Sequence, residues 1–153
     1  MREILKDKSG SMLILTMIIL FFLFSISLVL GEIYRLHSIG AHVEYELQRA
    51  VNIAVEEAMK DSWRQDKYGK LDTAKAKADF YDYLTNELAL NAAYQKSKDG
   101  GIVYTLEFDS VTAIEDPPRL QVTGTAKVKP AFPFLTGDIV IPFDIKSKNA
   151  RLD

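Results

Sequence analysis

An uncharged apolar run lies close to the N-terminus of this chain. Residues 12–30 read MLILTMIILFFLFSISLVL and contain no charged residue, no glycine and no proline. Their number matches the roughly 20 residues that an α-helix needs to cross the hydrocarbon core of a bilayer. A core helix of a small soluble protein would carry a polar face, and this run has none. The sequence therefore argues against a purely cytosolic enzyme and predicts a transmembrane helix over residues 11–31.

Three interpretations of this run compete. A cleaved signal peptide has a shorter apolar region of about 7–15 residues, followed by small residues at the cleavage site. Val29-Leu30-Gly31 would be a weak site of that kind. The second interpretation is a plain single-span anchor. The third is a pilin-type segment, which first spans the membrane and later lies in the core of a filament.

Basic residues on either side of the run predict its orientation. Residues 1–10 carry three of them, whereas Arg35 is the only one close to the other end. Because Lys and Arg are enriched on the cytoplasmic side of membrane helices, we expect residues 1–10 to form a cytoplasmic leader. Residues 32–153 would then be an extracytoplasmic domain. The predicted location is the cell membrane, crossed once.

The apolar pattern after the run predicts two helices. Apolar residues from Ile33 to Ala58 recur at steps of three and four, which is the period of one helical face. The transmembrane helix is therefore expected to continue outside the membrane, with a small domain folded against its apolar stripe. A short second helix is expected over Ala74–Leu90, with Asp72 or Thr73 as its N-cap.

Further along the chain the apolar period changes to two, which is typical of half-buried strands. Three segments show this alternation and a fourth is a candidate hairpin partner: Gly101–Phe108, Leu120–Lys129, Asp138–Lys146 and Ala93–Ser97. Gly124 is expected to mark a bulge, and Pro142 favours an edge strand. The predicted fold class is α+β: a long N-terminal transmembrane helix, a short second helix and a small antiparallel sheet of three or four strands.

No residue pattern predicts catalysis or metal binding. His37 and His42 are five residues apart, so on a helix they point about 140° from each other, whereas zinc-binding pairs lie at i and i+4. Neither Glu56-Glu57 nor Glu115-Asp116 has the alternating oxygen ligands of a calcium loop. The chain has no cysteine, and its net charge of −2 argues against a nucleic-acid binder. We therefore expect no enzyme activity, cofactor, metal, nucleic acid or small-molecule substrate.

Three stretches of the sequence are similar to one known family. Residues 8–20 read KSGSMLILTMIIL, residues 44–60 read EYELQRAVNIAVEEAMK, and residues 132–153 read FPFLTGDIVIPFDIKSKNARLD. In this order they resemble the leader junction, the helix that follows the membrane and the terminal strand of type IV pilins and pseudopilins. The likeness is greatest to the TadE-like group, the minor pilin-like proteins of tight-adherence pilus systems. The resemblance implies a pilin-like fold.

The resemblance also implies where processing and assembly would occur. A prepilin peptidase would cut between Gly10 and Ser11, which would make Leu15 the fifth residue of the mature chain. Many pilins carry Glu at that position, so this departure favours a minor or initiating subunit, or an anchored protein that is never processed. The helix face expected to contact neighbouring subunits comprises Leu13, Leu15, Ile19, Phe22, Leu30, Ile33, Leu36, Val43, Leu47, Ala54 and Ala58.

The predicted function is that of a membrane-anchored, pilin-like structural subunit, a minor pilin or pseudopilin, in a bacterial surface pilus or secretion apparatus. Its expected partners are the lipid bilayer, other pilin-like subunits and pilus assembly proteins. The alternative is a single-pass, membrane-anchored extracytoplasmic binding or scaffold module that does not polymerise.

Overall fold

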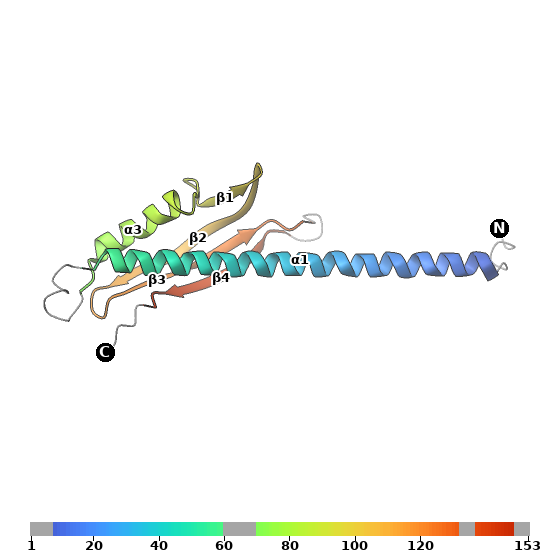
Figure 1. The fold of residues 1–153 in the computed structure, drawn as a ribbon, viewed down its shortest axis with the longest axis horizontal. Coiled ribbons are helices and arrows are strands. Elements are labelled where there is room, and N and C mark those ends of the chain that lie inside the picture. The colour runs from blue at the N-terminus through green and yellow to red at the C-terminus, as the bar shows by residue number, and fades with distance from the viewer. Residues whose placement is uncertain (1–7, 60–69, 132–136, 149–153) are drawn as a thin grey trace. The chain divides into compact units, whose positions relative to one another are not determined.

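The computed structural model describes residues 8–59, 70–131 and 137–148, which form two helices and four strands (Figure 1). The elements are α1 (Lys8–Glu57), α3 (Thr73–Asn86), β1 (Gln95–Lys98), β2 (Gly101–Ile114), β3 (Arg119–Val128) and β4 (Ile139–Lys146). The chain divides into two compact units, Met1–Ser38 and Ile39–Asp153, and α1 contributes residues to both. A long apolar N-terminal helix, a short second helix and an antiparallel sheet confirm the predicted α+β class.

The four strands form one antiparallel sheet in the order β1-β2-β3-β4, so each strand pairs with its neighbour in sequence. The connection from β1 to β2 is a two-residue turn at Asp99-Gly100, where φ is 52° and 79°. Positive φ at both central residues is what a type I′ hairpin turn requires. The predicted hairpin is therefore confirmed, and Pro142 lies on the edge strand β4 as expected.

The predicted bulge lies on β2, opposite Gly124, and not on the strand of the glycine itself. The pairing of β2 with β3 shifts between Phe108 and Ser110, which leaves Asp109 without a partner on β3. An extra residue inverts the alternation of apolar and polar side chains. The period-two pattern therefore stops at Phe108, whereas β2 continues to Ile114.

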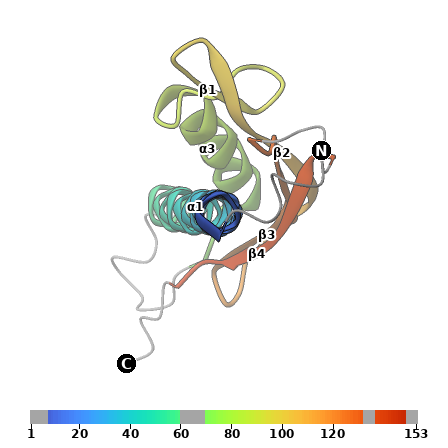
Figure 2. The same ribbon diagram turned by 90° about the vertical axis from the view of Figure 1, so that its right-hand side faces the viewer.

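α3 and the second half of α1 lie on the same face of the sheet (Figure 2). This half of α1, with the residue that follows it, buries the predicted stripe from Val43 onward. The buried residues of this stripe are Val43, Leu47, Ala50, Val51, Ala54, Val55 and Ala58. The sheet contributes Tyr104, Leu106, Leu120, Val122, Ala126, Val128 and Ile145. Packing against the sheet is what stabilises this half of the helix, since propensity alone contributes little.

α3 begins as predicted and ends earlier. The Asp72 carboxylate accepts hydrogen bonds from the amides of Ala74 and Lys75, each at 3.1 Å, which makes Asp72 the N-cap. The helix ends at Asn86 instead of Leu90. Leu88 and Leu90 are both buried, and residues two apart on a helix point about 160° from each other. Both leucines therefore reach the core only because the chain leaves the helix before them.

Substitution of Gly124 tests how closely β3 packs against the bulged strand β2 and the edge strand β4. A Cβ atom at this position would overlap the carbonyl oxygen of Glu107 and would lie 2.8 Å from Cζ of Phe143. We expect Gly124→Ala to lower the free energy of unfolding by about 1–3 kcal/mol, the usual range for overpacking. Denaturant unfolding of the full chain in detergent micelles, followed by circular dichroism, measures this change.

Gly101→Ala is the matched control, since the nearest atom to its added Cβ, the carbonyl oxygen of Lys98, lies 3.8 Å away. We expect its unfolding free energy to stay within about 0.5 kcal/mol of the wild type. Equal effects of the two substitutions would contradict the close packing at Gly124.

The pKa of Tyr104 on β2 reports on the packing of the sheet against α1. Its phenol is buried, and this burial, followed by the negative charge of Glu46 on α1, raises its pKa from 10.0 to about 12. The neutral phenol is therefore compatible with the fold and the phenolate is not. The stability that depends on the neutral phenol is complete below pH 10 and is lost as the pH rises towards 12.

We expect ultraviolet titration of the tyrosines to show a component near pH 12 that is absent from Tyr104→Phe. The same variant should resist alkaline unfolding to a higher pH than the wild type. Tyr45→Phe, at an exposed position on α1, serves as the control and should retain the component. Its loss in the control instead would show that a different tyrosine titrates there.

Candidate functional site

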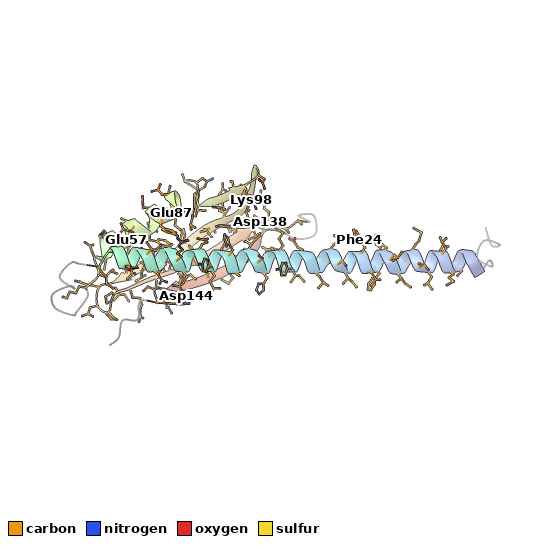
Figure 3. All side chains as sticks on the ribbon, in the orientation of Figure 1. Phe24, Glu57, Glu87, Lys98, Asp138 and Asp144 are labelled. Atoms are coloured by element: carbon orange, nitrogen blue, oxygen red, sulfur yellow. The ribbon has the colours of Figure 1, made fainter. Side chains whose placement is uncertain are left out.

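The first half of α1, here residues 12–31, has an apolar surface. Its most apolar 18-residue window has a mean hydropathy of 2.9, and none of that window is buried within the protein. Figure 3 shows its side chains, Phe24 among them, projecting from the helix ribbon. Phe24 itself is 62 % exposed. By length and composition, α1 can cross a membrane.

The polar side chains within this half are satisfied by the helix itself. The hydroxyl of Thr16 donates to the carbonyl oxygen of Met12 at 2.9 Å, and the hydroxyl of Ser25 donates to that of Phe21 at 2.8 Å. An unpaired hydroxyl would be unfavourable in hydrocarbon, where water cannot bond to it. These two groups therefore do not oppose burial of the helix in lipid or against other helices.

An ion pair between Glu32 and Arg35 follows the uncharged run. Arg35 donates from Nε to one carboxylate oxygen of Glu32 at 2.9 Å and from Nη2 to the other at 2.7 Å. This two-bond geometry is the strong form of an arginine–carboxylate contact. The hydrogen bond to Glu32 is the main cause that raises the pKa of Arg35 above its ordinary value. Opposite charges at i and i+3 are neighbours on a helix, so the spacing of Glu32 and Arg35 is the sequence signal for this pair.

The residues of the predicted assembly face fall into two groups. Leu13, Leu15, Ile19, Phe22, Leu30 and Ile33 are 49 to 63 % exposed, and Leu36 is partly exposed. Val43, Leu47, Ala54 and Ala58 are at most 3 % exposed, because they pack into the core of the second unit. The second group is therefore occupied by the protein's own core, and the surface open to other molecules is limited to the first.

The predicted processing site lies at the start of α1. Gly10 and Ser11 are both helical residues close to Lys8, where the helix begins. Most of the predicted leader, residues 1–7, lies outside the described residues, and so do residues 132–136 and 149–153 of the third stretch of the resemblance.

The other candidate groups stay apart on the surface. His37, His42 and the pair Glu56-Glu57 are exposed on α1. The pair Glu115-Asp116 is exposed in the turn between β2 and β3. Within residues 8–59, 70–131 and 137–148, no three His, Asp or Glu side chains gather closely enough to hold a metal ion.

A shallow cavity of about 170 Å³ lies between α1 and β4, beside Gly40, Glu44 and Phe143. This volume is below the roughly 300 Å³ at which small-molecule sites usually begin. The cavity therefore adds no candidate site, and the apolar half of α1, with the ion pair that follows it, is the surface that carries the functional argument.

Comparison with known proteins gives no further assignment. No family model, no curated protein and no solved structure matches this chain. The resemblance to TadE-like pilins therefore rests on the three sequence stretches alone, and it remains a prediction.

Proposed function

We propose that this protein is a membrane-anchored structural subunit of the pilin-like kind, a minor pilin or pseudopilin of a bacterial surface pilus or secretion apparatus. The first half of α1 anchors the chain, with residues 1–10 in the cytoplasm and the sheet domain outside. During assembly, neighbouring subunits replace lipid around that half. Partners are the bilayer, other pilin-like subunits and pilus assembly proteins.

The observation that carries this proposal is the division of one helix into two surfaces. α1 buries its second half against the protein's own sheet, while its first half is uncharged from Met12 to Leu30 and exposed on all sides. Lipid tails and apolar helices are nearly equivalent surroundings for such a surface. Replacement of lipid by neighbouring helices therefore costs little free energy, and transfer from a membrane into a filament requires this.

A second candidate is an anchored binding or scaffold module that does not polymerise. Leu15 favours it, because the position that would be the fifth of a processed chain carries no carboxylate, and none occurs between Asp7 and Glu32. In this alternative, lipid alone covers the first half of α1, and the sheet domain recruits a partner protein outside the membrane.

The mass of the mature chain, isolated from cells, separates the two candidates. A chain that starts at Ser11 and is recovered in sheared surface filaments is expected for the pilin-like subunit. A chain that starts at Met1 and stays in the membrane pellet after shearing would overturn the proposal in favour of the anchored module.

Leu15→Lys tests the role of the uncharged surface. A lysine inside a membrane span costs roughly 2.5–3.5 kcal/mol on insertion scales. We expect this variant to be depleted from the membrane fraction and to be lost from sheared filaments. Quantitative immunoblotting of the membrane, soluble and sheared fractions measures both effects.

Ala78→Lys places the same charge on an exposed position of α3 and serves as the control. It should leave the distribution unchanged. Normal assembly of Leu15→Lys would exclude this half of α1 from a filament core.

A further inference from the structure

Two tyrosines of the second unit lie in ring contact at its surface. Tyr81 is on α3, and Tyr94 immediately precedes β1. Their ring centroids are 6.1 Å apart, with 35° between the ring planes. Within residues 8–59, 70–131 and 137–148, no other two tyrosine rings are in contact. The pair therefore brings two phenols together from a helix and from the start of a strand.

Phe108 on β2 supports both rings from the side of the sheet. Its ring meets that of Tyr81 with centroids 6.3 Å apart and that of Tyr94 with centroids 5.2 Å apart, both edge to face. The backbone of Tyr94 has a φ of 53°, which side-chain-bearing residues rarely adopt. The amide of Leu106 donates to the carbonyl oxygen of Tyr94 at 3.0 Å and fixes this residue to the sheet. The contact between the two tyrosines is thus held by the surrounding structure.

The phenol groups of the pair are close to each other and open to solvent. Burial is the main cause that raises the pKa of Tyr81 above 10.0, and the phenol of Tyr94 is the second cause. A neighbouring phenol has this effect only at short range, so the ring carbons beside the two oxygens are near each other as well. Tyr81 is nevertheless 36 % exposed, and Tyr94 is partly exposed. An oxidant in solution therefore reaches the pair.

We propose that Tyr81 and Tyr94 form an oxidative cross-linking site, at which a haem peroxidase with hydrogen peroxide joins the two rings. Each phenol gives up one electron and one proton. The two phenoxyl radicals then couple through a carbon–carbon bond between ring carbons next to the oxygens, and the hydrogen on each joined carbon moves to the oxygen beside it. Hydrogen peroxide takes up the two electrons and two protons and becomes two water molecules. This inference goes beyond the proposed function and does not depend on it.

The bond would tie the end of α3 to the start of the sheet. The segment between the two tyrosines includes Leu88 and Leu90, which anchor it in the core. The chain has no cysteine, so a disulfide cannot provide a covalent tie of this kind. A cross-link that closes this segment into a loop restricts the unfolded chain and thereby favours the folded one.

The site is tested on the full chain in dilute detergent micelles, treated with hydrogen peroxide and a haem peroxidase. Trypsin combined with a glutamate-specific protease separates the two tyrosines, because Glu87 lies between them, and yields peptides 78–87 and 88–96. Mass spectrometry should find these two peptides joined, with the loss of two hydrogens. We expect this product to exceed every other tyrosine cross-link at least about tenfold, since groups held in contact react as an intramolecular pair.

Phenylalanine variants keep the ring and remove the phenol. Tyr81→Phe and Tyr94→Phe should each abolish the joined peptides while leaving the circular dichroism spectrum unchanged. Tyr83→Phe is the matched control, because Tyr83 lies on the same peptide as Tyr81 but is only 8 % exposed. It should retain the product. Loss of the product in Tyr83→Phe would assign the bond to Tyr83 and overturn the inference.

A reaction governed by exposure alone predicts a different product. Tyr45 is 65 % exposed, more than Tyr81, and its ring contacts no other tyrosine ring within the described residues. Cross-links through Tyr45 between separate copies would then dominate, and Tyr45→Phe would remove them. That outcome, or treatment that leaves peptides 78–87 and 88–96 unjoined, would overturn the inference.

Discussion

The structure depends on how the surface of one long helix is covered. The second half of α1 presents an apolar stripe that α3 and the sheet bury, including Leu47 and Val51, which are almost inaccessible. The first half presents apolar side chains on every side, with no stripe for a single layer to cover. Exposure of apolar area to water costs about 25 cal/mol per Å². Within the described residues nothing covers the first half, which by length and composition can cross a membrane.

Polar contacts close the second unit at the places where a helix or strand ends. The side chain of Gln48 donates to the carbonyl oxygen of Lys146, and Lys75 donates to that of Glu57 at the end of α1. The sheet is closed to further strands by other means. β1 is short and carries two lysines, and β4 carries Pro142, which has no amide hydrogen to donate. Neither edge favours addition of another strand.

The sequence predicted the elements of this fold better than their boundaries. Periods of 3.6 and two, an N-cap at Asp72 or Thr73 and a hairpin partner before Gly101 are local signals, and the structure confirms them with Asp72 as the N-cap. The errors occur where packing overrides the local pattern. The bulge at Asp109 lengthens β2 past the point where alternation fails, and burial of Leu90 shortens α3. The candidate surface could be recognised from composition, but the start of the buried stripe at Val43 could not, because it depends on where α1 packs into the core of the second unit.

The uncharged character of the first half of α1 leaves a question of specificity. Apolar side chains pack almost equally well in many registers, so they determine that helices associate without determining how. In the proposed assembly no carboxylate at position 15 is present to select a neighbour. Glu32 and Arg35 are the first charged groups after the run, and they bond to each other within the helix. The apolar run alone therefore accounts for anchoring in a membrane and, in the proposed assembly, leaves the choice of neighbour to groups outside it.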